Sequence, residues 1–474
     1  MTHRQKQREH REVEIDVTSI GAEGVSVGRV DGVVHFVKGA LPGEHVRAVV
    51  RRQHRRYVDT EVVEVIRSSP DRIEPPCEHF GICGGCSWQH LMYEKQLQWK
   101  SGTVHDALQR IGGIETVPLL DPIGSGAIYA YRNKMEFSFS SAPWLTQSEI
   151  DSGEVFDRTF ALGLHVPGRY DKVRHLQHCH LQSDAANKLL ENVHNLPQLR
   201  EVPAYNHREH VGFLRHLVIR SSSYSGAIVC VLITTQPSNN IEEELHASFL
   251  ALHKTLPENS TLIVAVNNTH SPVATGEIIA QLGPGFLEER THEVTYRISP
   301  FSFFQTNTQQ MHSLVALGLD AAQLTPNDVA WDLYCGTGTL TLPAARRAKK
   351  VVGAELVQSS IDDARSNALR NDISNVEFHA VDLHAKHALD VLRGFEQPDA
   401  IIIDPPRSGM HPQVVEHLLA VAPPRISYVS CNPSTMARDV ALMSDHYEIT
   451  WVRAIDMFPQ TSHVEAVAAL SRRY

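Results

Sequence analysis

The chain has 474 residues, of which 42% are hydrophobic and 21% charged, and its formal net charge is −10. This is the composition of a soluble globular protein, long enough for two or three domains with apolar cores. The sequence has no apolar run long enough to cross a membrane, and its polar start, MTHRQKQREHRE, is unlike a secretory signal, so we expect a cytoplasmic protein. The negative net charge argues weakly against a nucleic-acid partner, but local charge distribution matters more than the sum.

Residues 9–68 predict a small β-barrel. They contain several short β-rich segments, among them EVEIDVTSI and GVSVGRVDGVVHFVKG, which Gly, Asp and Pro separate. Strands at such spacing are typical of barrels, and small barrels often bind nucleic acid, although a fold alone does not prove it. Within this region, a span of ten residues contains five arginines, namely Arg47, Arg51, Arg52, Arg55 and Arg56. Taken alone, this run favours a solvated edge strand.

The rest of the chain divides into two regions. Residues 69–300 predict an α+β domain, because a helical stretch at 93–112 precedes mixed β segments such as FLRHLVIRSS and GAIVCVLITT. Residues 301–474 repeat a pattern of apolar strand, turn and helix four times. Buried strands that alternate with helices indicate a parallel, doubly wound sheet. The fold class is therefore α/β, with a Rossmann-like C-terminal domain.

Four of the seven cysteines predict a metal centre. Cys77, Cys83 and Cys86 form a C-x5-C-x2-C pattern within CEHFGICGGC, and Cys179 follows much later. An odd number of cysteines in a large chain without a secretory signal argues against a disulfide framework. Four thiols can ligate one centre, and from the spacing alone zinc is favoured, because tetrahedral zinc sites made only of cysteine are common.

Acidic residues at successive strand ends of the C-terminal region predict a cofactor pocket. Asp332 opens the glycine-rich turn DLYCGTGTL, and Glu355, Asp382 and Asp404 end or follow the next three strands. Each residue alone could equally well cap a helix, but four in succession are harder to explain in that way. The lack of a full GxGxxG pattern argues against a dinucleotide. Together these features resemble the S-adenosylmethionine pocket of class I methyltransferases.

Cys431 lies at the carboxyl end of a strand, in RISYVSCNPST, where a side chain can meet a ligand. Carbon 5 of a pyrimidine is a poor nucleophile, but a thiolate that adds to carbon 6 makes carbon 5 able to attack a methyl group. A base must then remove the hydrogen from carbon 5. Glu465, in SHVEAVAAL, is a candidate for this base, because burial raises a carboxyl pKa toward a useful range. The alternatives are a packing cysteine and an exposed or ion-paired glutamate.

The sequence resembles the S-adenosylmethionine-dependent RNA 5-methyluridine methyltransferases along nearly its whole length. SFFQTN, DLYCGTGT, DPPRSGM, SCNPSTMARD and HVEAVAAL match the pattern of that family in order. The resemblance implies that Cys431 is the nucleophile and Glu465 the general base. It also implies a set of residues that contact the methyl donor or organise its site: Gln305, Tyr334, Glu355 and Asp404. Tyr334 stands where many relatives carry Phe, which leaves a stacking role possible.

The resemblance also changes two of the interpretations above. Residues 9–68 resemble a TRAM domain, a small RNA-binding barrel, so the arginine run is expected to contact phosphate. One branch of the family carries the cysteine spacing seen here and holds a 4Fe–4S cluster. By that resemblance Cys77, Cys83, Cys86 and Cys179 ligate such a cluster rather than zinc.

The combined prediction is an RNA uracil-C5 methyltransferase, a monomer that makes 5-methyluridine in 23S ribosomal RNA through a transient adduct of cysteine with carbon 6. Transfer RNA is the alternative substrate. Two other classes remain open, an iron–sulfur RNA-binding protein without catalysis and a methyltransferase that acts on nitrogen or on protein. The target uridine is expected to leave its stack, because the thiol cannot otherwise reach carbon 6.

Overall fold

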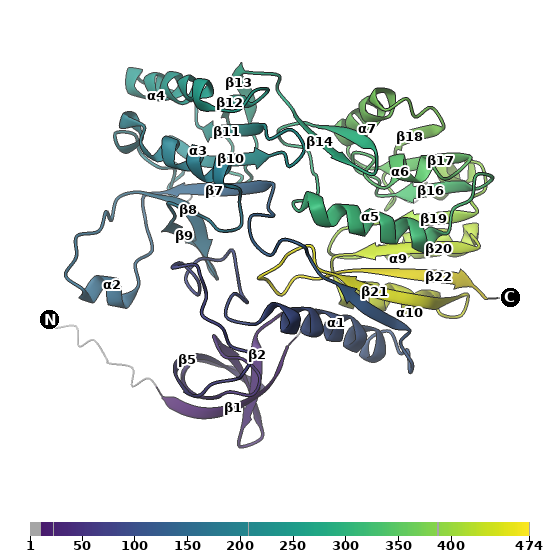
Figure 1. Cartoon of the computed structure of the whole chain (residues 1–474), viewed down its shortest axis with the longest axis horizontal. Coiled ribbons are helices and arrows are strands. Elements are labelled where there is room, and N and C mark those ends of the chain that lie inside the picture. The colour runs from purple at the N-terminus through teal and green to yellow at the C-terminus, as the bar shows by residue number, and fades with distance from the viewer. Residues whose placement is uncertain (1–10, 22, 207, 386–387, 474) are drawn as a thin grey trace.

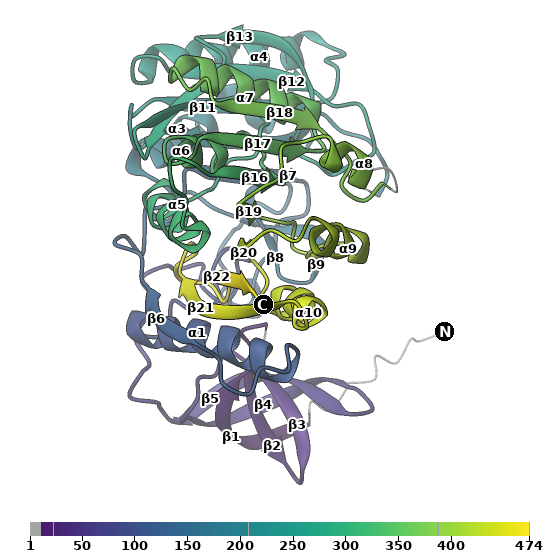
Figure 2. The same ribbon diagram turned by 90° about the vertical axis from the view of Figure 1, so that its right-hand side faces the viewer.

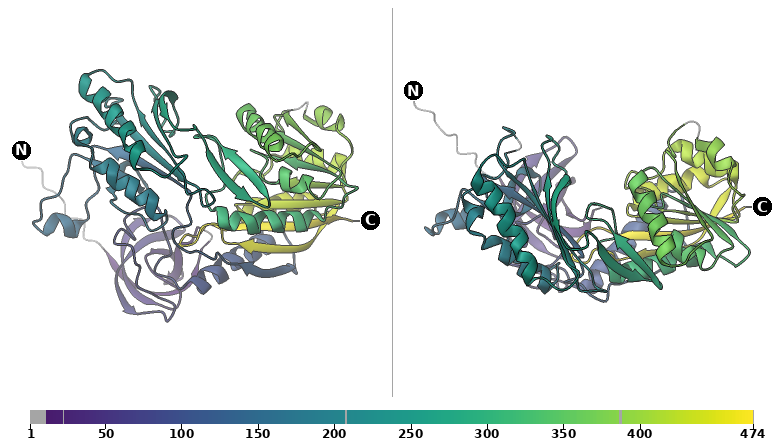
Figure 3. Two further views of the ribbon diagram at one scale, coloured as in Figure 1. Left: turned by 45° about the horizontal axis from the view of Figure 1, so that its top comes forward. Right: turned by 90° about the horizontal axis from the view of Figure 1, so that it is seen from above.

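The computed structural model describes residues 11–21, 23–206, 208–385 and 388–473. In Figure 1 a small barrel lies at the bottom, a central sheet at the upper left and a C-terminal sheet on the right. Figure 2, turned by 90°, shows α1 (Tyr93–Arg110) lying between the barrel and the C-terminal sheet. The views of Figure 3 show the central and C-terminal sheets at opposite ends of the molecule. None of the helices among the described residues is both long and apolar enough to span a membrane.

The N-terminal region is a closed barrel, as the sequence predicted. Its strands are joined in the order β1-β2-β3-β5-β4. Alternate side chains such as Ile15, Val17 and Val46 fill its interior, which is what the period of two along each strand requires. The strand bounds are β1 (Glu12–Ile20), β2 (Ser26–Val30), β3 (Val33–Lys38), β4 (His45–Gln53) and β5 (Tyr57–Arg67).

The central region is an α+β unit built on a seven-stranded sheet of order β13-β12-β11-β10-β7-β8-β9. Three adjacent strands, β12, β11 and β10, are buried along almost their whole length, which explains why their sequences are continuous apolar runs. The strands are β7 (Lys134–Ser140), β8 (Ala161–Val166), β9 (Arg169–His175), β10 (Leu214–Ser221), β11 (Ile228–Thr234), β12 (Thr261–Val266) and β13 (Glu277–Leu282). The helices are α2 (Gln147–Asp151), α3 (Asp184–His194) and α4 (Asn240–Ala251), with 3-10 turns at Pro197–Arg200 and Leu252–Thr255.

The C-terminal region is a doubly wound sheet of order β18-β17-β16-β19-β20-β22-β21-β6. The first five strands are parallel, and β22 runs antiparallel to both of its neighbours. The strands are β16 (Val329–Leu333), β17 (Lys350–Glu355), β18 (Val376–Ala380), β19 (Ala400–Ile403), β20 (Arg425–Ser430), β21 (Tyr447–Ile455) and β22 (Glu465–Arg472). The helices are α5 (Thr308–Ala322), α6 (Thr341–Ala345), α7 (Gln358–Arg370), α8 (Ala388–Arg393), α9 (Pro412–Val421) and α10 (Pro433–Met443).

A strand, a helix and a hairpin that precede residue 301 pack against the C-terminal region. The strand β6 (Leu119–Ile123) pairs in parallel with β21 and forms the last strand of that sheet. The helix α1 packs against α10 and β6. The hairpin of β14 (Leu287–Thr291) and β15 (Val294–Ile298) packs against α5 and α7. The division into residues 9–68, 69–300 and 301–474 stays a prediction, and these segments show that the second and third parts are interleaved.

Candidate active site

A cavity of about 1030 Å³ opens at the carboxyl ends of the parallel strands, where the order of the C-terminal sheet reverses between β16 and β19. Such a switch point is where open α/β sheets bind ligands, because the loops on either side turn away from each other. All the residues that the sequence assigned to catalysis and to the methyl donor line this one cavity: Gln305, Tyr334, Glu355, Asp404, Cys431 and Glu465. Their individual roles remain predictions.

The glycine-rich turn after β16 fixes the carboxylate of Glu355. The backbone of Tyr334 and Gly336 is left-handed, with φ of 65° and 54°, so the chain reverses tightly. The amide of Gly336 donates to Oε2 of Glu355 at 3.2 Å, and the amide of Val357 donates to Oε1 at 2.9 Å. Val357, not Glu355, is the N-cap residue of α7. The carboxylate at the end of β17 is therefore oriented by backbone amides and is not the cap of the following helix.

Burial raises the pKa values of the carboxyl groups of Asp332 and Asp404 toward neutral pH. Burial raises the pKa of Asp332 to about 7, and the hydroxyl of Thr341 donates to its Oδ2 at 2.6 Å. Burial likewise raises the pKa of Asp404 to about 6. Asp404 is not the cap of the next helix either, because α9 begins after His411. Both groups favour a proton more than an exposed carboxyl does.

Cys431 follows the last residue of β20 and precedes α10. Asn432 caps α10, since its side chain accepts from the amide of Ser434 at 3.1 Å, and it also donates to the carbonyl of Arg407 at 3.0 Å. These bonds hold the half-buried thiol at the cavity wall. Burial raises the pKa of Cys431 to about 11, while the guanidinium of Arg407 acts in the opposite direction. In the free protein at neutral pH the sulfur therefore carries its proton.

Glu465, the first residue of β22, is 4% exposed and pairs with Ile455 across the antiparallel ladder. Burial and then the charge of Asp404 raise its pKa well above the usual range for glutamate. The charges of Glu465 and Asp404 in turn raise the pKa of Cys431. The three groups are thus close enough to influence one another's protonation. The interpretation of Glu465 as an exposed residue is wrong.

The cavity wall also contains residues to which the sequence gave no role. They include Arg132, Phe303, Arg407 and His463. Phe303 is 69% exposed, and burial lowers the pKa of His463. Arg407 and His463 each lie within three residues of a predicted site residue, in DPPR and SHVE, which is a signal that could have found them. Arg132 and Phe303 come from segments whose local sequence shows no such pattern.

The four predicted cysteine ligands surround a second, small cavity, together with His79, His178 and His180. Burial raises the pKa of Cys83 to about 11 and that of Cys86 to about 12, and the charges of neighbouring thiols act in the same direction. Within the described part of the chain, no three His, Cys, Asp or Glu side chains are grouped closely enough to hold a single metal ion.

The two candidate centres make different demands on the four thiols. A tetrahedral zinc ion needs every sulfur at about 2.3 Å from one point. In a 4Fe–4S cluster each thiolate binds a different iron, so the four sulfurs stand farther apart. A centre of either kind must displace the thiol protons, which makes its binding dependent on pH.

All five arginines of the barrel run are exposed, and two of them form ion pairs. Arg47 forms ion pairs with Glu64 and Glu12, and Nε of Arg51 lies 2.7 Å from Oε2 of Glu61. The side chains of Arg52, Arg55 and Arg56 are exposed. The two groups therefore differ in how much positive charge each offers to a phosphate.

The strand order, the glycine-rich turn and the cavity at the switch point define a class I methyltransferase. Comparison with known proteins agrees: the model of the tRNA (uracil-5-)-methyltransferase family matches residues 231–473, and that of the TRAM domain matches residues 6–63. The chain belongs to the tRNA (uracil-5-)-methyltransferase family, and it is an RNA methyltransferase that uses S-adenosylmethionine.

Individual relatives cover the chain almost completely. An uncharacterised RNA methyltransferase of Chlorobaculum tepidum is 38% identical over 469 residues, which are 97% of this chain and 96% of the relative. Another, of Bacteroides thetaiotaomicron, is 37% identical over 457 residues, which are 96% of this chain and 100% of the relative. Among solved structures, the tRNA (uracil-54, C5)-methyltransferase of Pyrococcus abyssi, in complex with S-adenosyl-L-homocysteine, matches with a TM-score of 0.73 and 26% identity and covers 97% of this chain and 100% of that one.

Proposed function

We propose that this RNA uracil-5-methyltransferase works through a covalent adduct on Cys431. The observation that carries the proposal is the meeting of one thiol and two buried carboxyls, Cys431, Glu465 and Asp404, in the wall of the donor cavity. Methylation of a nitrogen or oxygen atom uses an existing lone pair and requires no thiol. Methylation of carbon 5 requires a nucleophile and, later, a base, and this wall contains a candidate for each.

The residues act in a fixed order. The thiol of Cys431 first gives up its proton to water, the resulting thiolate forms a bond to carbon 6, and the electrons of the carbon 5–carbon 6 double bond move toward the carbonyl at carbon 4. S-adenosylmethionine supplies an electrophilic methyl group, which carbon 5 takes up as S-adenosylhomocysteine leaves. Glu465 then accepts the proton of carbon 5, the double bond re-forms and the sulfur leaves carbon 6. The raised pKa of Glu465 makes its carboxylate a stronger proton acceptor than an exposed glutamate.

Trapping on 5-fluorouridine RNA tests this route. Fluorine at carbon 5 cannot leave as a proton, so the methylated adduct stalls and migrates as a protein–RNA band in denaturing gels. The wild type is expected to form the band with S-adenosylmethionine, whereas Cys431→Ala forms none and transfers no labelled methyl group. Cys230→Ala, which removes a buried thiol from β11, serves as the control. Normal methylation by Cys431→Ala would exclude the adduct, and no transfer by the wild type would favour a non-catalytic RNA-binding protein.

For the substrate we propose 23S ribosomal RNA, on the basis of the cysteine spacing, which resembles that of the branch that modifies large-subunit RNA. Transfer RNA is the second candidate, because the Pyrococcus abyssi enzyme acts on uracil 54 of tRNA. Both RNAs are to be mapped for 5-methyluridine in a strain that lacks the gene. Loss of a modified position from ribosomal RNA supports the proposal, and loss from tRNA alone overturns it. A cytoplasmic location and a monomeric state belong to the same proposal, and light scattering on the purified protein tests the second.

For the cysteine site we propose a 4Fe–4S cluster on Cys77, Cys83, Cys86 and Cys179. The support is the ring of four thiols around one small cavity. Protein purified without oxygen is expected to contain about four iron and four sulfide per chain. One zinc per chain and no sulfide would instead assign a zinc site. Cys230→Ala should leave the metal content unchanged, while Cys83→Ser lowers it.

A further inference from the structure

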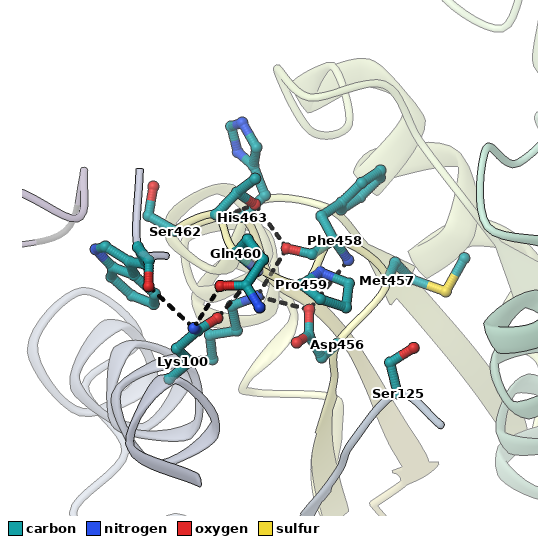
Figure 4. A network of polar contacts seen from close by, with 12 residues as sticks. Lys100, Ser125, Asp456, Met457, Phe458, Pro459, Gln460, Ser462 and His463 are labelled. Atoms are coloured by element: carbon teal, nitrogen blue, oxygen red, sulfur yellow. Dashed lines mark hydrogen bonds and ion pairs between the residues drawn. The ribbon is translucent and has the colours of Figure 1, made fainter. Parts of the chain in front are cut away.

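The segment between β21 and β22, residues 456–464, leads directly into Glu465 and is held by α1, whose Lys100 lies 356 residues before Asp456. Nζ of Lys100 donates to Oδ1 of Asp456 at 2.6 Å and to the carbonyl of Phe458 at 3.1 Å. The amide of Phe458 donates to the same Oδ1 at 3.0 Å. Figure 4 shows these contacts converging where the segment turns. Lys100 and Asp456 are each 1% exposed, so water does not compete for them.

A second pair of contacts lies one helical turn earlier. The amide of Gln460 donates to Oε1 of Gln96 at 3.0 Å, and Nε2 of Gln96 donates to Oε1 of Gln460 at 3.0 Å. Gln460 has a left-handed backbone with φ of 68°. That conformation costs a residue other than glycine roughly 1–2 kcal/mol, and it persists only where neighbours fix it. Gln96 and Lys100 are four residues apart on α1 and therefore face the same way.

The energetics of this ion pair indicate a role other than stability. Removing two charges from water costs several kcal/mol, and apolar pairs of similar volume are often at least as stable. Burial lowers the pKa of Lys100 and the carboxylate of Asp456 raises it again. The pair instead fixes the conformation of the segment, because one ammonium group binds both a side chain and a backbone carbonyl of it. Four residues of the segment, Phe458, Thr461, Ser462 and His463, line the donor cavity with Glu465.

We propose that Gln96 and Lys100 are positioning residues for the removal of the carbon 5 proton, because they set the path of the chain that places Glu465. This inference rests on the proposed function. Cys431 directly follows a different strand, β20, and its place is set by the cap of α10. A loosened segment therefore slows the step that needs Glu465 more than the step that needs Cys431. The methylated RNA adduct then accumulates, because it forms normally and decays slowly.

The experiment compares Lys100→Met and Gln96→Leu with the wild type on uridine RNA that carries tritium at carbon 5. We expect both variants to release tritium about tenfold more slowly, which corresponds to about 1.4 kcal/mol, and to show a protein–RNA band without 5-fluorouridine. Glu465→Gln marks the fully stalled limit. A deuterium isotope effect at carbon 5 should appear in the variants. Lys95→Met, on the same helix but 3.7 Å from Asp71, is the matched control and should behave as the wild type.

A folding defect is separated from the proposed role in two ways. The double variant Lys100→Met/Asp456→Leu removes both charges at once and keeps the volume, so it is expected to remain folded and still to accumulate adduct, since the bond to Phe458 is lost. The inference would be overturned if tritium release and adduct formation were slowed by the same factor. It would also be overturned if the variants accumulated no more protein–RNA adduct than the wild type. No transfer by the wild type would refute the proposed function itself.

Discussion

The amide of Ser462 donates a hydrogen bond to Oγ of Ser87 at 3.1 Å. Ser87 directly follows Cys86, one of the cysteines around the second cavity, and Ser462 lies three residues before Glu465. The amide of Ser87 also donates to the carbonyl of Gln460 at 2.9 Å. Gly84, Gly85, Cys86 and Ser87 line the donor cavity themselves. The cysteine segment and the segment before the base thus share one wall, and a disturbance of the first reaches the second.

Loss of the proposed cysteine centre is therefore expected to impair the binding of RNA more than the binding of the methyl donor. Cys83→Ser removes the proposed anchor of residues 84–87, whereas the amides of Gly336 and Val357 that hold Glu355 lie outside this segment. The KM for RNA should rise about tenfold or more, with the Kd for S-adenosylhomocysteine within about twofold of the wild type. Steady-state kinetics and calorimetry measure the two quantities. An equal loss of both would show that the centre supports the whole fold instead.

Glu355→Ala is expected to reduce affinity for the donor. A charge-assisted hydrogen bond contributes about 1.5–3 kcal/mol, so the loss should be about 10- to 100-fold. The effect should be visible by titration of the protein with S-adenosylhomocysteine, with RNA affinity little changed. Asp362→Ala, on an exposed face of α7 with its side chain 63% exposed, is the matched control. Unchanged affinity in Glu355→Ala would remove this residue from the donor site.

Three of the predicted residues that line the cavity share one property. Glu355, Asp404 and Cys431 each stand at or just after the end of a parallel strand, and the carboxyl ends of parallel strands meet at one edge. A local pattern of strand and turn is enough to find them. The barrel was predicted for a related reason, since its short β-rich segments and the Gly, Asp and Pro between them are local features of the sequence.

The residues that sequence reasoning missed depend on contacts between distant segments. Lys100 lies in a polar helical stretch, and nothing within that stretch distinguishes it from the half-exposed Lys95. Its burial follows from the packing of α1 against the C-terminal sheet, as does the addition of β6 to that sheet. Such contacts depend on tertiary packing and leave no local period. For the cysteines, spacing alone favoured zinc, whereas the family resemblance implied a 4Fe–4S cluster, which remains a proposal.

Most of the attraction of the barrel for RNA is expected to come from Arg52, Arg55 and Arg56. The triple variant Arg52→Ala/Arg55→Ala/Arg56→Ala should weaken RNA binding at low salt and reduce the slope of log K against log salt by about two, because each lost phosphate contact on a single strand removes about 0.7. Arg47→Ala/Arg51→Ala, whose side chains are paired with Glu64 and Glu61, is the comparison and should change the slope less. Equal slopes for the triple variant and the wild type would place the RNA elsewhere.

The rate of adduct formation is expected to rise with pH. The pKa of Cys431 lies at about 11, so the thiolate fraction grows about tenfold for each pH unit below that value. Single-turnover trapping on 5-fluorouridine RNA between pH 6.5 and 9.5 measures this without involving the base. The variant Arg407→Gln loses the guanidinium that opposes the upward shift, so its profile should move to higher pH. A rate independent of pH in this range would mean that bound RNA already deprotonates the thiol.

Asp332→Asn is expected to stabilise the protein at pH 8 and to destabilise it by about 1–3 kcal/mol near pH 4, where only the cost of the unpartnered amide remains. The pKa of Asp332 is 3.8 when unfolded and about 7 when buried in the folded chain. Below pH 3.8 the group is protonated in both states, and as the pH rises to 7 the folded state progressively loses stability, by on the order of 4 kcal/mol in total.

Asparagine abolishes that penalty and can still accept the bond from Thr341, but its amide replaces Oδ1, which has no hydrogen-bond partner among the described residues. That unmet amide costs about 1–3 kcal/mol, so the net gain at pH 8 should be about 1–3 kcal/mol. Urea unfolding at the two pH values measures it, with Asp362→Asn as the exposed control. A loss of stability at pH 8 would show that the Asp332 carboxylate makes a favourable interaction as an ion.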